Sequence, residues 1–139
     1  METEPHIIER YVKTGKARLI YHYTIQIGEG SRTLAEATEC AGTQGKYWEM
    51  RELIYRSQEQ FFRDASYAAV QPLVAALGLD QASFKQCFEQ GQSRQQVQDN
   101  NAAVQRDRVR SDPTVDINGT RIVGAQPFEV FQQVLDAVQ

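Results

Sequence analysis

The chain has 139 residues, which is enough for one domain and short for two. Hydrophobic residues make up 41% of it, charged residues 24%, and the net charge is −3. This balance gives no electrostatic basis for binding nucleic acid or an anionic membrane. No apolar stretch approaches the roughly 18 residues of a membrane span. We therefore expect a globular domain without a nucleic-acid partner and without a membrane span.

The first elements are a helix and a strand. Thr3-Glu4-Pro5 has the form of a helix start, since a proline in the first turn lacks only an N–H that would stay unpaired. Gly15 ends this helix. Residues 17–23, A-R-L-I-Y-H-Y, are rich in β-branched and aromatic side chains, which predicts a strand.

Residues 31–108 show helical periodicity throughout, which predicts four or five helices without strands. Asp80 is a good cap for one of them, in which Phe84, Cys87 and Phe88 share a face.

The last part of the chain returns to strands. Asn118-Gly119 is a strong hairpin signal, because a type I′ turn needs positive φ at both central residues. It predicts a hairpin over 114–123. Pro127 then opens an amphipathic helix. The order of elements favours an α/β fold with a small sheet.

The two cysteines, Cys40 and Cys87, are 47 residues apart, which excludes a local redox pair and a zinc knuckle. Three interpretations remain: two buried thiols, one structural disulfide, or a single reactive thiol. The last is the least favoured, because neither cysteine has a basic residue nearby to lower its pKa. His6 and His22 have no metal-ligand spacing. No phosphate loop, dinucleotide motif or hydrolase elbow occurs, so we expect no catalytic residues, no metal and no cofactor.

Several stretches together resemble the DsbA-type branch of the thioredoxin superfamily: E-P-H-I-I-E-R-Y-V-K-T-G-K-A-R-L-I-Y-H-Y (4–23), A-E-A-T-E-C-A-G-T-Q-G-K-Y-W-E-M (35–50), L-G-L-D-Q-A-S-F-K-Q-C-F-E (77–89) and 109–131. The resemblance implies a single thioredoxin-like domain over 1–139. Residues 1–27 and 109–139 would form its thioredoxin part, and residues 31–108 a helical insertion. It also implies thiol–disulfide exchange in periplasmic or extracellular proteins.

The chain departs from that family at its start. Family members begin with a strand and a helix that carries a reactive C-x-x-C, whereas this chain begins partway along that helix and has no C-x-x-C. We therefore expect an N-terminally truncated member of the family. The acidic start M-E-T-E-P lacks the basic-then-apolar order of a signal peptide. The compartment is therefore open, and the chain as written is expected in the cytoplasm.

Two site assignments follow from the resemblance. The proline that begins the hairpin is cis in the family and touches bound peptide, which implies a peptide-binding role for Pro113 and for Asp112 before it. Related exported proteins often carry an extra bridge in the helical insertion, which implies a structural disulfide between Cys40 and Cys87.

The missing first strand lies in the middle of the family's sheet, between the counterparts of 17–23 and 114–123. Its loss would leave a sheet of about three strands with two edges about 9.6 Å apart. Strand 17–23 could move over to pair with 114–118, two chains could pair, or a partner peptide could add as a strand. We favour self-association into a homodimer.

These expectations give three functional hypotheses. The first is a non-catalytic DsbA-like module that binds a protein or peptide, or itself, and is not an enzyme. The second is a thiol–disulfide oxidoreductase whose C-x-x-C part is missing from this chain. The third is a structural or assembly protein that acts through an open sheet edge.

Overall fold

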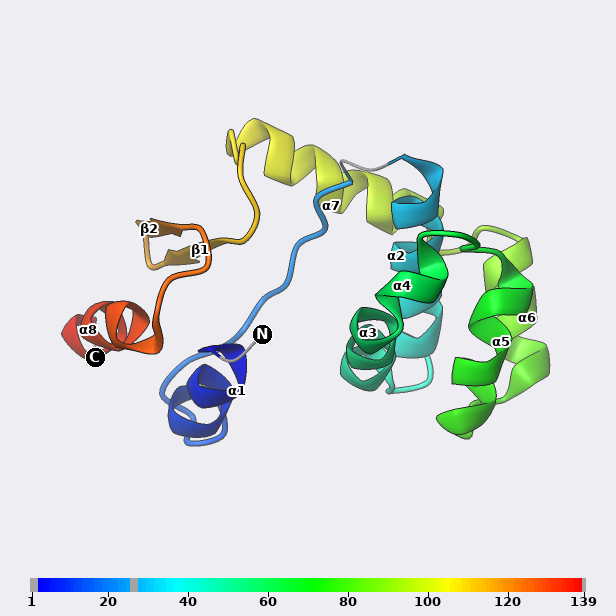
Figure 1. Cartoon of the computed structure of the whole chain (residues 1–139), viewed down its shortest axis with the longest axis horizontal. Helices are drawn as coiled ribbons and strands as arrows, with labels where there is room; N and C mark the ends of the chain where they lie inside the picture. Colours follow the sequence, from blue (N-terminus) through cyan, green and yellow to red (C-terminus); the bar gives the residue numbers. More distant parts are fainter. Residues whose placement is uncertain (1–2, 26–27, 139) are drawn as a thin grey trace. The chain divides into compact units, whose positions relative to one another are not determined.

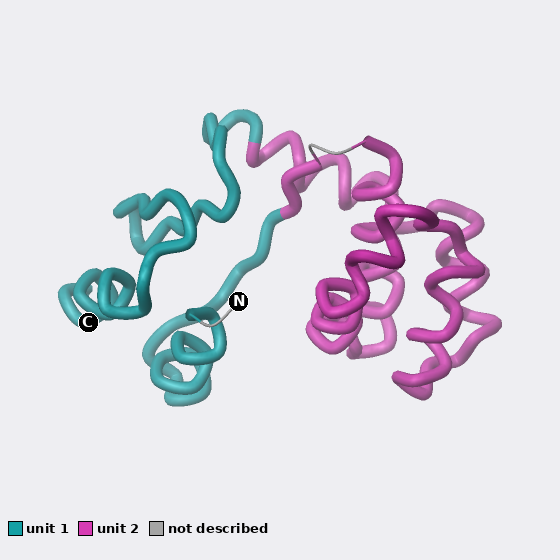
Figure 2. The backbone as a smooth tube through the Cα atoms, viewed as in Figure 1, with its two compact units in different colours: residues 1–22, 105–139 teal, residues 23–104 magenta. Residues whose placement is uncertain are grey.

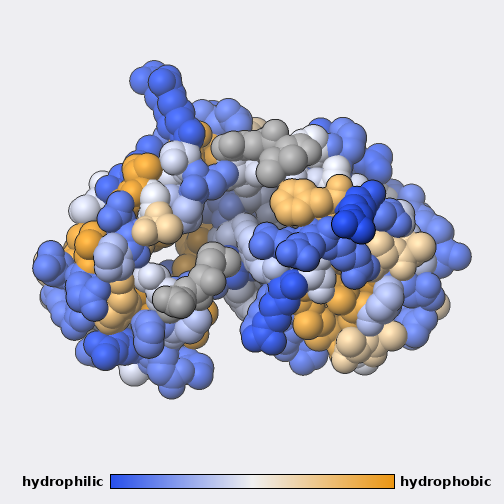
Figure 3. Space-filling view, in the orientation of Figure 1, coloured by the Kyte–Doolittle hydropathy of each residue, from blue (hydrophilic) through white to orange (hydrophobic). Residues whose placement is uncertain are grey.

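The computed structural model describes residues 3–25 and 28–138. The chain divides into two compact units (Figure 2). Unit 1 combines the two ends of the chain, 1–22 and 105–139, and unit 2 is the continuous stretch 23–104. Apolar side chains reach the surface in both units (Figure 3).

The described residues of unit 2 form six helices, where the sequence predicted four or five (Figure 1). Asp80 caps the helix that follows it, because its Oδ1 accepts the Ser83 N–H at 2.7 Å, as the sequence predicts. The helices are α2 (Glu29–Gly42), α3 (Tyr47–Arg56), α4 (Gln58–Phe61), α5 (Tyr67–Ala76), α6 (Gln81–Glu89) and α7 (Arg94–Arg106), the last of which extends two residues beyond the unit.

The core of unit 2 is continuous and cross-linked. A disulfide joins Cys40 on α2 to Cys87 on α6, with 5.9 Å between their Cα atoms. The disulfide implied by the resemblance is therefore confirmed. Both cysteines belong to a cluster of buried apolar residues: Ala37, Cys40, Ala41, Met50, Phe61, Val70, Val74, Leu79, Phe84 and Cys87.

Unit 1 begins with α1 (Thr3–Ile7), which continues directly into a π-helical turn, η1 (Ile8–Val12). Tyr11 C=O then accepts the N–H groups of Lys16 and Ala17, both at 2.9 Å, and this ends the helix. The unit also holds strands β1 (Thr114–Ile117) and β2 (Thr120–Val123) and helix α8 (Phe128–Ala137).

The β1–β2 hairpin has the predicted turn. Asn118 and Gly119 have φ values of 49° and 92°, so both central residues lie on the positive side that a type I′ turn requires. The strands pair antiparallel, with Val115 opposite Ile122 and Ile117 opposite Thr120. One face of the hairpin packs on α8 and η1, around a small buried cluster of Tyr11, Ile122, Phe131 and Leu135.

The described residues form an α/β structure with a helical unit and a small sheet, as expected, but the prediction of a strand over 17–23, and with it a sheet of about three strands, is wrong. The described residues form a two-stranded sheet of β1 and β2. The N–H groups of Tyr23 and Ile25 instead donate to the Oδ1 atoms of Asn100 and Asn101 on α7, at 2.8 and 3.1 Å. The side-chain amides of α7 thus accept hydrogen bonds that the backbone of a neighbouring strand would otherwise have accepted.

Across 3–25 and 28–138, no helix has both the length and the apolar character needed to cross a membrane. Within the same ranges, no three His, Cys, Asp or Glu side chains gather in an arrangement that could hold a metal ion.

Candidate functional site

The hairpin fixes the position of Pro113, which directly precedes β1. The Asp112–Pro113 peptide bond is cis. The C=O of Pro113 accepts the Gly124 N–H at 2.8 Å, which extends the β1–β2 ladder by one pair. The Thr114 hydroxyl donates to the C=O of Ser111, so the chain on both sides of Pro113 is held by the hairpin.

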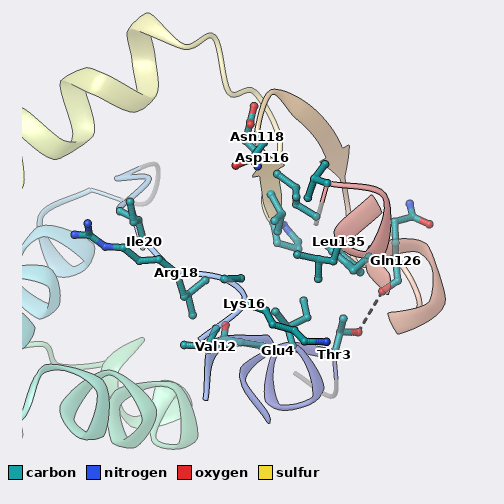
Figure 4. Close-up of a pocket in the computed structure, with 18 of the residues that line it drawn as sticks. Thr3, Glu4, Val12, Lys16, Arg18, Ile20, Asp116, Asn118, Gln126 and Leu135 are labelled. Atoms are coloured by element: carbon teal, nitrogen blue, oxygen red, sulfur yellow. Dashed lines mark hydrogen bonds between the residues drawn. The ribbon is translucent and has the colours of Figure 1, made fainter. Parts of the chain in front are cut away.

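A cavity of about 880 Å³ lies in unit 1, with Pro113 in its wall (Figure 4). Residues 16–20 form one wall and residues 115–118 another, while α8 contributes Phe131 and Leu135. Figure 4 shows Arg18 and Ile20 on the segment that follows η1, with Asp116 and Leu135 on the other side. A volume of this size is in the upper part of the range for ligand sites, about 300–1,000 Å³.

Among the described residues, the lining is mainly apolar and carries four charged side chains. Its apolar residues are Ile7, Val12, Ala17, Leu19, Ile20, Pro113, Val115, Ile117, Phe131, Leu135 and Val138. The charged residues are Lys16, Arg18, Glu4 and Asp116. Apolar walls with a few polar groups are the usual composition of a binding site.

Two hydrogen bonds connect the N-terminal helical segment of unit 1 to the C-terminal part of that unit. The Tyr11 hydroxyl of η1 donates to Asp136 Oδ1 of α8 at 2.6 Å, and this bond to a carboxylate, together with burial, raises the pKa of Tyr11 above its usual value of 10. At the other end, Thr3 Oγ1 donates to the C=O of Gln126 at 3.2 Å.

Of the two residues assigned to peptide binding, one lines the cavity and the other does not. Pro113 lines the cavity. Asp112 is exposed and already takes part in an interaction, and it is not part of the cavity wall.

The wall residues 16–20 were missed by the sequence analysis, which assigned 17–23 to a strand inside the sheet. A signal for them exists in the chain, because charged Lys16 and Arg18 alternate with apolar Ala17 and Leu19 directly after the helix end.

The two cysteine sulfur atoms lie in unit 2 and are inaccessible. Cys40 is fully buried and Cys87 is 4% exposed. Ser93 Oγ lies 3.4 Å from Cys40 Sγ and 3.5 Å from Cys87 Sγ, inside the same core. Thiol exchange requires a thiolate that another molecule can reach. The bridge therefore has the surroundings of a structural disulfide.

Unit 2 also holds a partly buried acid–phenol contact that the sequence did not reveal. The Tyr23 hydroxyl donates to Glu39 Oε1 at 3.1 Å, and Gln96 Nε2 donates to Glu39 Oε2 at 2.7 Å. Burial raises the pKa of Glu39, although the bond from Tyr23 acts in the opposite direction. Burial also raises the pKa of Tyr23 far above its usual value.

A family model described as thioredoxin matches residues 1–137. The chain belongs to the thioredoxin family. Among solved structures it is similar to the crystal structure of alpha-DsbA1 from Wolbachia pipientis, with a TM-score of 0.72 and 18% sequence identity over 97% of this chain and 74% of that one. At this identity the likeness shows a shared fold. No curated protein matches the chain.

Proposed function

We propose that this protein is a non-catalytic, DsbA-like thioredoxin-fold module that binds a peptide or protein segment in the cavity of unit 1. In this proposal residues 1–27 and 109–139 form the thioredoxin part, which carries the site, and residues 31–108 form the helical insertion. The observation that carries the proposal is the apolar cavity of about 880 Å³ with Pro113 in its wall.

The state of the two cysteines supports peptide binding over redox catalysis by this chain. Its two cysteines are both in the buried bridge of unit 2. Pro113 and its cavity belong to unit 1, and every described residue that lines the cavity comes from that unit. A chain with these features keeps a surface for binding polypeptide and offers no accessible thiolate of its own.

Peptide binding is tested by titrating the protein into a fluorescent library of extended peptides and following anisotropy. We expect selected members to bind, and we expect Val115→Arg, which introduces a charged side chain into the cavity wall, to reduce their affinity at least about tenfold. Val130→Arg is the matched control, because Val130 is a half-exposed valine of α8 outside the cavity lining. Equal loss in both variants, or no binding by any peptide, would refute the proposal.

The alternative is a thiol–disulfide oxidoreductase whose reactive cysteines are not in this chain. Reduction of insulin by dithiothreitol distinguishes the two. We expect no acceleration by the protein, and the same result for the Cys40→Ser, Cys87→Ser double variant. Turnover that disappears in the double variant would assign redox activity to this chain and overturn the proposal.

Self-association is the second binding mode that we propose, because an unpaired strand edge can pair with a copy of itself. Light scattering over a hundredfold range of concentration measures it directly. A mass that rises from 15.8 kDa toward twice that value supports a homodimer. A constant 15.8 kDa leaves the cavity to other polypeptides.

A further inference from the structure

One edge of β1 has no strand beside it. The Gly124 N–H bond to Pro113 C=O and the pairs Val115–Ile122 and Ile117–Thr120 show which residues direct their backbone groups toward β2. Because this direction alternates along an antiparallel strand, Thr114 and Asp116 direct their N–H and C=O groups to the opposite edge. In the described part of the chain, the sheet ends at that edge.

Residues 17–20, in the wall across the cavity, are extended in the same way. Exposure alternates along them, with Ala17 and Leu19 half-buried and Arg18 and Ile20 exposed, Ile20 to 60%. Alternation with a period of two is the pattern of a strand with one covered face. Within residues 3–25 and 28–138, no hydrogen bond engages the backbone N–H or C=O groups of 18–20.

The two walls present their apolar side chains to the same cluster. Ala17 from one wall, and Val115 and Ile117 from the other, pack around Tyr11, Ile122, Phe131 and Leu135. A strand placed between the walls would therefore put every second side chain onto this cluster. Those side chains need to be apolar, and the alternate ones point to the opposite face.

The charged residues of the cavity lining indicate which alternate side chains an added strand should carry. Asp116 is occupied, since its Oδ1 accepts the Gly119 N–H at 2.7 Å and its Oδ2 lies 3.8 Å from Arg121 Nη2. Glu4 also has an interaction already. By contrast, the described residues provide no carboxylate partner for Lys16 or Arg18. The charges of the cavity that have no partner among the described residues are thus positive, and acidic side chains of a ligand would complement them.

We infer that the cavity of unit 1 accepts an extended segment of another polypeptide, with alternating apolar and acidic side chains, which adds as a strand between β1 and residues 17–20. This rests on the proposed function and defines its ligand: backbone hydrogen bonds at Thr114 and Asp116 supply affinity, and Lys16 and Arg18 supply selectivity. Strand addition completes a sheet that the described chain leaves at two strands.

Three synthetic peptides of roughly seven residues test the inference. The first alternates valine and glutamate, the second replaces glutamate with lysine, and the third is the first with alternate peptide nitrogens methylated. We expect the glutamate peptide to bind about tenfold more tightly than the lysine peptide, and methylation on the edge that faces β1 to weaken binding about tenfold or more.

A charge reversal identifies the residue responsible. Arg18→Glu is expected to weaken the glutamate peptide about fivefold to tenfold and to strengthen the lysine peptide. Arg63→Glu, at an exposed arginine of unit 2, is the matched control and should leave both affinities unchanged. Circular dichroism of each variant shows whether the fold is retained.

The outcomes separate the two proposals. Equal binding of all three peptides, still sensitive to Val115→Arg, overturns strand addition and leaves peptide binding in place. Absence of binding by these peptides and by the library overturns both. A concentration-dependent doubling of mass that Val115→Arg abolishes, together with no binding of the glutamate peptide, would show that a second copy fills the site, and would refute the assignment to another polypeptide.

Discussion

The two units bury their apolar side chains to different extents. In unit 2, ten buried residues of the described chain form one cluster around the Cys40–Cys87 bridge. In unit 1 the corresponding cluster has four, and two of them, Phe131 and Leu135, also line the cavity. Unit 2 thus completes its own core, whereas unit 1 keeps one side of its core open. An open core beside an unpaired strand edge is suited to take up another polypeptide segment.

Removal of the disulfide should have the largest effect on stability, and it should leave peptide binding in unit 1 intact. In the chain-entropy model, a bridge that spans 47 residues contributes about 4 kcal/mol. The Cys40→Ala, Cys87→Ala double variant should therefore lose about that much free energy of unfolding in urea, while peptide binding in unit 1 is retained under conditions where the variant is folded. The denatured wild type should release no free thiol without reductant, and two free thiols would contradict the bridge.

A matched pair of leucines compares the two cores. Leu79 of unit 2 is 8% exposed and Leu135 of unit 1 is 6% exposed, but only Leu135 borders the cavity. Leu79→Ala should cost about 3 kcal/mol, and Leu135→Ala nearer 2 kcal/mol, because a side chain beside a void has fewer contacts to lose. Chemical denaturation measures both variants. A larger cost at Leu135 would show that the core of unit 1 is closed.

The hydrogen bond from Tyr11 to Asp136 should stabilise unit 1 by a smaller amount. Tyr11→Phe removes the 2.6 Å bond and should lower the free energy of unfolding near neutral pH. Because the folded pKa of Tyr11 is raised above 10, this contribution is fully present below pH 10 and is lost as the pH rises through the folded pKa. Wild type and variant should therefore converge in strongly alkaline solution, as followed by thermal unfolding. A constant difference across that range would argue against the bond.

Substitution of Glu39 in unit 2 should change stability least, and at neutral pH it should stabilise the protein rather than destabilise it. Burial raises its pKa in the folded state, so the stability linked to its protonated form is present below the unfolded pKa and is lost as the pH rises through the folded pKa. Glu39→Gln should thus be slightly more stable than wild type at pH 7, by an amount that solvent screening of this half-exposed group keeps small, and equal to it near pH 3.5. Thermal unfolding at both pH values tests this, and a less stable variant at pH 7 would contradict it.

The elements that were predicted correctly depend on neighbours in the chain. Asn118-Gly119 specifies its turn through its own φ preferences, Asp80 caps α6 through a residue three positions later, and α8 follows Pro127 as expected. The bridge between Cys40 and Cys87 is different. Residue spacing left three interpretations open, and family resemblance favoured the one that the structure contains.

The predicted strand over 17–23 failed because local preference does not specify a partner. Its side chains do alternate in exposure, as a strand's would, but the N–H of Tyr23 donates to Asn100, 77 residues away. No property of the segment itself indicates that acceptor. The cavity was missed for the same reason, since its walls come from opposite ends of the chain.

The amino-acid sequence by itself determined the helical character of unit 2, the hairpin turn and the lack of a C-x-x-C in this chain, because these depend on residue identity and short-range geometry. Only the tertiary structure decided that the sheet has two strands and that Lys16, Arg18 and the free edge of β1 border one apolar cavity. Such features depend on which distant groups satisfy each other's hydrogen bonds and which apolar surfaces meet, and that is settled by packing in three dimensions.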